Sequence, residues 1–257
     1  MPSETPTHTE EDTLMTTLPS KPVLETALAH RSIRKFTDEA ISPEMLNAVL
    51  EAGRAASSSS FLQVVHIVRV TDHELRKGLR AVGSDQRYIE NCAEFLVFCM
   101  DFAKHKKVDS GVQTDWTEVT LIGTVDAGIM AQNILLAAES LGLGGIYIGS
   151  LRNDVNRVAE LLNLPEYVVP LFGMCLGHPA QDPLYRPRLP LDTIVSENCY
   201  KPLDSETLEA YDEVVYDYYQ RRSNLDLDWS AQVRDTLCRE VRPDILPFLQ
   251  KQGLAKK

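Results

Sequence analysis

Residues 122–149 read IGTVDAGIMAQNILLAAESLGLGGIYIG, and this stretch decides the fold because it joins a long apolar helix to a strand. Apolar residues wrap most of the circumference of the helix predicted over 122–143. Such a helix is typical of a core or of a subunit interface. Gly142, Gly144 and Gly145 are expected to end it, and a strand is predicted to resume over 146–149.

Helices and short strands alternate on both sides of this stretch. Ser42 is a predicted helix N-cap, with Pro43 at the first helical position. Residues 95–100 are continuously apolar, which is typical of a central strand buried on both faces. The alternation predicts an α/β or α+β layered domain. Other helices are expected over 23–30, 43–54, 72–79 and 153–162 and in two segments after Leu203, and other strands over 61–70 and 168–176.

Composition excludes several classes of protein. A net charge of -11 over 257 residues argues against a nucleic-acid surface, because such surfaces neutralise phosphates with many basic side chains. No window has the roughly 18 uninterrupted apolar residues of a membrane span. The length fits one large domain or two small ones.

The N-terminus and the cysteines indicate the cellular compartment of the protein. Residues 1–22 are expected to form a disordered tail, and they lack the apolar segment of a signal peptide. Five cysteines are scattered without a CxxC motif or a Cys/His cluster at zinc-ligand spacing. We therefore expect a cytoplasmic protein without a metal site.

The heptapeptide HRSIRKF, residues 30–36, concentrates positive charge in an acidic chain. Guanidinium groups give forked hydrogen bonds to phosphate, so a phosphorylated cofactor is one expected ligand. A solvated basic patch that pairs with Asp38 and Glu39 is the alternative, and the heptapeptide alone favours neither.

Three further segments have the character of a site for a phosphate or a planar ligand. The serines of the loop SSSSF, residues 57–61, could bind a polar edge, although a plain linker is the favoured reading in isolation. In GGIYIGS, residues 144–150, glycines allow backbone amides to approach a flat ring, but no GxGxxG fingerprint is present. The extended RPRLP, residues 186–190, puts two arginines on one side as a phosphate clamp, or is a proline-rich surface loop.

No nucleophile motif accompanies these segments. The chain has no Walker A sequence, no GxSxG and no HExxH. Anion clamps without a nucleophile indicate that a bound cofactor carries the reaction.

Five segments carry a resemblance when they are taken in their order along the chain: HRSIRKFTDEAIS, ASSSSFLQ, LAAESLGLGGIYIGSLRN, PLFGMCLG and RPRLP. Together they resemble the NADPH-dependent, oxygen-insensitive nitroreductase and flavin reductase family, in particular its major bacterial branch. The resemblance covers roughly residues 23–250. It implies an α+β fold of the nitroreductase type, with a mixed, mostly antiparallel sheet wrapped by helices. It also implies an interlocked homodimer with two FMN sites at the interface. Residues 23–257 would form this domain, with a C-terminal helical arm over about 203–257.

The resemblance implies a role for each matching residue. Arg34 would lie near N1 and O2 of the flavin ring and stabilise the charge that reduction leaves there. Relatives often have Lys at the position of Arg186 and Gly at that of Ser150. The implied phosphate ligands are His30, Arg31, Ser32, Arg186 and Arg188; Ser58, Ser59 and Ser60 would come from the partner subunit, Gln86 would bind the pyrimidine edge, and Tyr147, Ile148, Gly149 and Ser150 would line the ring.

The arm bears on the electron donor. Arg222 and Arg242 match positions that the family uses for NADPH and acceptors, and Phe61 would border the same pocket. Asp226 and Asp228 stand where relatives carry arginines, and acidic side chains would repel a 2′-phosphate. NADPH remains the favoured donor over NADH.

The activity implied is transfer of electron pairs from NAD(P)H to nitroaromatics, quinones or flavins by a ping-pong mechanism. One alternative is an NAD(P)H:flavin or quinone reductase with little nitro activity. Another is a non-catalytic FMN-binding protein, for which the altered loop at Asp226 and Asp228 is the support.

Overall fold

The computed structural model describes residues 19–257, so most of the tail predicted over 1–22 lies outside the described residues. Within 19–22, the backbone N–H of Lys21 donates to the carbonyl of Ser140 (2.9 Å). The chain divides into two compact units. The first runs to Asp182 and is completed by Asp244–Lys257, and the second is Pro183–Pro243.

The first unit is built on a four-stranded antiparallel sheet in the order β1-β2-β4-β3. All eight residues of the central strand β2 are buried, which confirms the prediction from its continuous apolar run. The strands are β1 (Val65–Arg69), β2 (Glu94–Asp101), β3 (Gly144–Ile148) and β4 (Val168–Gly177).

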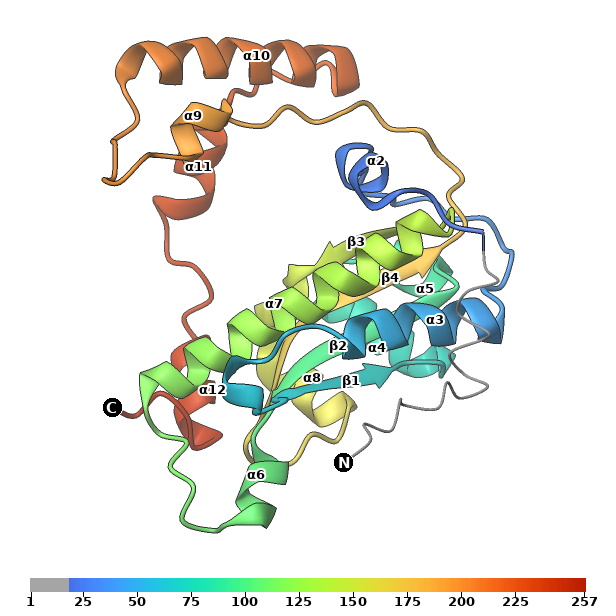
Figure 1. The fold of residues 1–257 in the computed structure, drawn as a ribbon, viewed down its shortest axis with the longest axis vertical. Coiled ribbons are helices and arrows are strands. Elements are labelled where there is room, and N and C mark those ends of the chain that lie inside the picture. Colours follow the sequence, from blue (N-terminus) through green and yellow to red (C-terminus); the bar gives the residue numbers. More distant parts are fainter. Residues whose placement is uncertain (1–18) are drawn as a thin grey trace, which may run out of the picture. The chain divides into compact units, whose positions relative to one another are not determined.

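Helices cover both faces of this sheet. Alternate residues of β2 point to opposite faces, so each face has its own set of core residues. Phe95, Val97 and Cys99 face α4 (His73–Val82), α5 (Tyr88–Asn91) and α8 (Val155–Leu161). Leu96 and Phe98 face α3 (Pro43–Arg54) and α7 (Thr117–Ser140), which run along the sheet in Figure 1. The sheet is thus the middle of three layers, and the predicted α+β class is confirmed.

Helix α7 is long and apolar enough to cross a membrane by length and composition alone. Its inward residues Ala131, Ile134 and Leu135 are instead buried against the sheet and α3. The helix also carries a fully buried carboxylate, that of Asp126. These contacts are those of a core helix.

The N-cap of α3 is confirmed, since the Ser42 hydroxyl accepts from the Met45 N–H (3.2 Å). Gly142, at a φ of +85°, follows α7 as expected. Gly144 and Gly145 were also expected to end the helix, and that prediction is wrong, because they are the first two residues of β3.

Other boundaries differ from the predicted ones. The strand expected over 61–70 begins only at Val65, because the preceding residues form a tight 3₁₀ turn, η1 (Ser59–Phe61). The helix expected over 153–162 is a 3₁₀ segment, η2 (Gly149–Asp154), followed by α8. The first helix, α2 (Val23–Leu28), is shorter than predicted. Helices α6 (Ala103–Val108) and α12 (Ile245–Lys251) were not predicted.

The second unit contains α9 (Leu191–Ile194), α10 (Ser205–Ser223) and α11 (Trp229–Leu237). Its core is a cluster of three tyrosines and a valine from α10, with Trp229 packed against it. The arm predicted over 203–257 is divided differently here. Residues 183–243 form the second unit, and α12 buries Phe248 in the core of the first.

Candidate functional site

The basic heptapeptide 30–36 lies against the start of β3. The Ile33 N–H donates to the Gly145 carbonyl (3.0 Å), and Ser32 forms a parallel bridge with Gly145. Ile33 is buried, and a Cβ built on Gly144 would lie 2.5 Å from Ile33 Cγ1. Glycine at 144 is therefore required for the close approach of these two motifs, which are distant in sequence.

The charges of the heptapeptide are held in different ways. His30 Nδ1 lies 2.6 Å from Glu139 Oε1 on α7. Arg31 Nη1 donates to the His30 carbonyl (2.9 Å), and Arg34 Nη1 to the Ser32 carbonyl (3.4 Å). Glu39 approaches His178 (3.7 Å).

Tyr88 brings a third segment to Arg34. Burial raises the pKa of Tyr88, and the nearby Arg34 guanidinium partly opposes that shift. Tyr88 begins α5 and is two residues from Gln86. The sequence analysis did not select Tyr88, since a single aromatic residue carries no motif.

Gln86 and Ser150 meet in the structure. The Ser150 hydroxyl lies 3.1 Å from Gln86 Oε1 and 3.2 Å from the Gly83 carbonyl. The residue predicted to bind the pyrimidine edge and one predicted to line the ring therefore share a hydrogen bond. Ser150 is the second residue of η2, directly after β3.

Tyr147 is the exposed residue of β3, whereas Ile148 is buried. Its hydroxyl donates to Gln132 Oε1 (3.2 Å), and its ring contacts Phe172 edge-on at 5.5 Å between centroids. Burial first, and the charge of Glu139 second, raise the pKa of Tyr147 to about 12. The phenol is therefore neutral across the physiological range and acts as a hydrogen-bond donor.

The serine loop is anchored on a residue that the sequence analysis missed, Asp126 of α7. Its carboxylate accepts from the Ser58 hydroxyl (3.0 Å), the Ser59 hydroxyl (2.7 Å) and the Ser59 N–H (3.1 Å). Ser60 and Phe61 adopt left-handed backbone conformations, and the Phe61 ring is 81% exposed. An aspartate within an otherwise apolar helix was the signal in the sequence.

The two arginines of RPRLP have separate contacts within the second unit. Arg186 Nη2 donates to the Tyr219 hydroxyl (2.7 Å) and to Gln232 Oε1 (3.0 Å). Arg188 Nη1 donates back to the Arg186 carbonyl (2.9 Å). Both guanidinium groups thus have hydrogen-bond partners of their own in this unit, and the phosphate clamp stays a prediction.

The acidic loop of the arm has local structural roles. Asp228 is the N-cap of α11 and accepts from the Ala231 N–H (2.6 Å). Asp226 Oδ1 accepts from Gln220 Nε2 (2.7 Å) and from the Tyr216 hydroxyl, and the latter bond raises the pKa of Tyr216.

The two arm arginines predicted to bind the donor are found in different settings. The Arg222 guanidinium lies over the Tyr218 ring, 5.8 Å from its centroid. Arg242 has a left-handed backbone, with a φ of 49°, at the end of the second unit.

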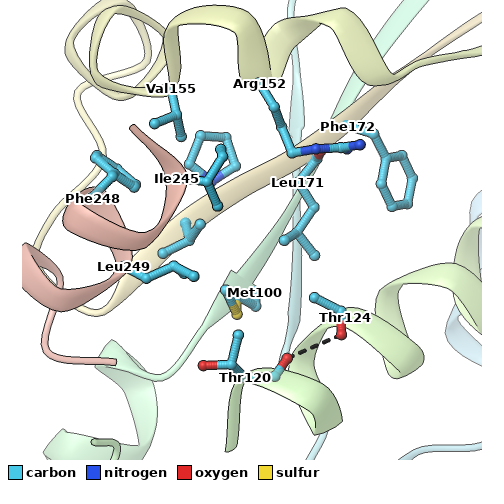
Figure 2. Close-up of a pocket in the computed structure, with 12 residues that line it drawn as sticks. Met100, Thr120, Thr124, Arg152, Val155, Leu171, Phe172, Ile245, Phe248 and Leu249 are labelled. Atoms are coloured by element: carbon cyan, nitrogen blue, oxygen red, sulfur yellow. Dashed lines mark hydrogen bonds between the residues drawn. The ribbon is translucent and has the colours of Figure 1, made fainter. Parts of the chain in front are cut away.

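A cavity of about 390 Å³ lies in the first unit between α7, β4, η2–α8 and α12 (Figure 2). Its walls are largely apolar, with Arg152 and the hydroxyls of Thr120 and Thr124 as polar groups. No residue selected from the sequence lines it. It adjoins the candidate site through Phe172, whose ring contacts Tyr147.

The structure thus brings together the heptapeptide, the segment 86–88 and residues 147–150. It ties the serine loop to α7 separately. Among residues 19–257, no group of His, Cys, Asp and Glu could hold a metal ion.

Comparison with known proteins gives consistent matches along the chain. A family model described as Nitroreductase family matches residues 27–178, and one described as Nitroreductase family, C-terminal domain, matches residues 186–257. An NADPH-flavin oxidoreductase of Vibrio harveyi is 55% identical over 236 residues, which cover 91% of this chain and 98% of that protein. An oxygen-insensitive NADPH nitroreductase of Salmonella typhimurium is 48% identical over 238 residues, covering 92% and 99%.

Solved structures agree with these sequence matches. The structure of an NADPH:FMN oxidoreductase from Vibrio harveyi complexed with NAD+ has a TM-score of 0.87 and 54% sequence identity. The match covers 91% of this chain and 99% of that chain.

Proposed function

Because the chain belongs to the nitroreductase family, we propose that it is an FMN-dependent oxidoreductase that takes electrons from NADPH. It passes them in pairs to nitroaromatics, quinones or flavins by a ping-pong mechanism. The names of relatives at 55% and 48% identity, for NADPH-dependent flavin and nitro reduction, support the donor and the acceptor classes.

The contact of the heptapeptide with β3 is the observation that carries this proposal. Through the Ile33–Gly145 hydrogen bond, a segment with two arginines lies beside β3, which ends at Ile148 and leads into η2. Guanidinium groups suit a phosphate and an electron-rich ring edge, and a strand end with a glycine suits a flat ring. These groups fit FMN.

Each segment then has one task in holding FMN. Arg31 and Ser32, with His30, are proposed ligands of the phosphate, and Arg186 and Arg188 are proposed phosphate ligands as the resemblance implies. Gln86 binds the pyrimidine edge, and residues 147–150 line the ring. FMN supplies the redox centre that accepts a hydride and releases two electrons to the acceptor.

Arg34 supplies the electrostatic part of catalysis. Its guanidinium donates to the Ser32 carbonyl (3.4 Å) and adjoins the Tyr88 hydroxyl. A fixed cation at the pyrimidine edge stabilises the negative charge that reduction leaves there. This preference for the fully reduced state favours transfer in pairs.

We propose a homodimer because α7 has an uncovered apolar row. Leu121, Val125 and Ile129, spaced by four residues, are 53%, 54% and 40% exposed. Residues four apart lie on one helix face, and an exposed row of this kind is typical of an interface. The partner's serine loop, with Ser58, Ser59 and Ser60, then completes each FMN site, and Phe61 borders the substrate pocket.

We assign NADPH and acceptor binding to Arg222 and Arg242. The contacts of Asp226 and Asp228 bear on the donor, because both carboxylates already accept hydrogen bonds from the arm itself. These contacts position the two carboxylates but leave their negative charge in place, because every donor is a neutral group. The names of the relatives are therefore what favours NADPH as the donor and a catalytic role.

The setting of the enzyme follows from its chemistry. The cysteines of the described chain are free thiols, three of them buried, as expected in a reducing cytoplasm. Its ligands are small molecules, and neither nucleic acid nor a membrane is a proposed partner.

Anaerobic stopped-flow absorbance of the FMN-loaded protein, mixed in turn with NADPH and NADH, tests this function. We expect fast bleaching of the flavin by NADPH and slower bleaching by NADH. The reduced protein is then mixed with a nitroaromatic, a quinone or free FMN to rank the acceptors. Reoxidation by quinone and flavin alone would favour the reductase with little nitro activity. No bleaching by either donor would contradict the proposal.

A further inference from the structure

Ser150 links two segments of the candidate site, residues 147–150 and the turn before α5. It is half-buried as the second residue of η2, and its hydroxyl is within hydrogen-bond distance of Gln86 Oε1 (3.1 Å) and of the Gly83 carbonyl (3.2 Å). A hydroxyl has a single proton to donate and both neighbours are acceptors, so the two oxygens compete for that proton. Gln86 Oε1 is the nearer of the two, and donation to it ties the Gln86 side chain to η2.

The backbone of this turn is fixed independently. Ser84 and Asp85 both adopt left-handed conformations, with φ of 60° and 56°. Asp85 is held by Arg80 Nε (2.7 Å), and Ser84 Oγ accepts from Asn153 Nδ2 (2.9 Å). The carbonyl of Gln86 accepts from the Ile89 N–H (3.0 Å) at the start of α5. These contacts do not fix the rotation of the Gln86 carboxamide.

We propose that Ser150 is a positioning residue that sets the orientation of the Gln86 carboxamide toward the flavin. Because Oε1 is engaged by the hydroxyl, the amide presents its two Nε2 protons as donors. Donors suit the carbonyl oxygens of the pyrimidine edge, which become more negative on reduction. Ser150 thereby strengthens FMN binding and raises the flavin potential, and this inference rests on the proposed FMN function.

The experiment measures the FMN dissociation constant by quenching of flavin fluorescence, and the midpoint potential of the holoprotein by spectroelectrochemistry. For Ser150→Ala we expect a dissociation constant about five-fold higher, the effect of one hydrogen bond, and a more negative potential. Ser150→Thr keeps the hydroxyl and should restore both values. Ser84→Ala removes the Asn153 bond from the same turn and should change neither, which separates positioning from a general loosening of the turn.

A double-mutant cycle with Gln86→Ala decides whether Ser150 acts through Gln86. In that background Ser150→Ala should have no further effect on the dissociation constant or the potential. An equal effect in both backgrounds, or unchanged values for Ser150→Ala alone, would overturn the proposal. Wild-type protein that fails to bind FMN would overturn the proposed function and the role of Ser150 together. Flavin-loaded wild type with an unaltered Ser150→Ala variant would overturn the role of Ser150 alone.

Discussion

At the scale of single residues, several polar side chains that could bind a ligand form hydrogen bonds within the protein instead. Ser58 and Ser59 give their hydroxyls to Asp126, and Asp226 and Asp228 accept hydrogen bonds inside the arm. A buried polar group without a hydrogen-bond partner costs free energy. Breaking such contacts is therefore unfavourable, and they hold the loops in place. The serine loop therefore has a structural role. A ligand can be bound only by the groups of the loop that do not donate to Asp126.

Asp126→Ala should lower the free energy of unfolding by about 3 kcal/mol, because the partly buried donors of the serine loop lose their acceptor. Urea denaturation of the flavin-free protein measures this loss. Glu118→Ala removes an exposed carboxylate from the first turn of the same helix and should stay within about 0.5 kcal/mol. Equal stability of the two variants would contradict the role given to Asp126.

Arg34→Ala should slow reduction of the bound flavin by NADPH by about 100-fold and make its midpoint potential more negative, because a fixed positive charge is lost at the ring edge. Stopped-flow absorbance and a redox titration measure the two effects. Lys35→Ala removes the same charge from the exposed neighbouring position and serves as the control. An unchanged potential in Arg34→Ala would remove Arg34 from its proposed role.

At the scale of elements, β3 is defined by close contacts rather than by side-chain pattern. A Cβ on Gly145 would lie 2.7 Å from Leu135 Cδ1 and 2.9 Å from the Cys175 carbonyl. A Cβ on Gly144 would meet Ile33. The two glycines let the strand lie close to α7, β4 and the heptapeptide, and in this way they shape the candidate site.

Gly144→Ala should destabilise the protein by about 1–3 kcal/mol, as overpacking does, and should lower its FMN content by displacing Ile33 and the heptapeptide. Thermal unfolding and the absorbance of purified protein measure both effects. Gly111→Ala is the matched control, because its new methyl group would meet only the flexible Asp109 side chain. Full flavin content in Gly144→Ala would show that the heptapeptide does not depend on this contact.

At the scale of the whole molecule, α7 has two functions. One face is buried against the sheet and α3, and the other leaves Leu121, Val125 and Ile129 exposed. A core helix explains the first face, and the proposed homodimer explains the second.

Val125→Asp should convert the dimer into monomers and remove the FMN, because a charge in the apolar row would be desolvated on association. Size-exclusion chromatography with light scattering gives the mass, and absorbance gives the flavin content. Glu118→Ala, earlier in the same helix, should remain dimeric. A dimeric, flavin-loaded Val125→Asp protein would contradict the proposed interface.

Local patterns in the sequence were sufficient for most of the elements. The apolar run of β2, the Ser42 cap of α3 and the apolar circumference of α7 depend on nearby residues only, and the structure confirms each. The motifs, taken in order, also identified the family. These signals are reliable because hydrophobic periodicity and capping act over a few residues.

Only the tertiary structure decided how distant polar groups are paired. The bonds of Asp126 to the serine loop, of Ser150 to Gln86 and of Ile33 to Gly145 each join segments more than sixty residues apart. The return of α12 to the first unit and the position of Gly144 inside β3 are likewise set by packing. Such contacts leave no periodic trace in the sequence, because each depends on where the folded chain brings one side chain.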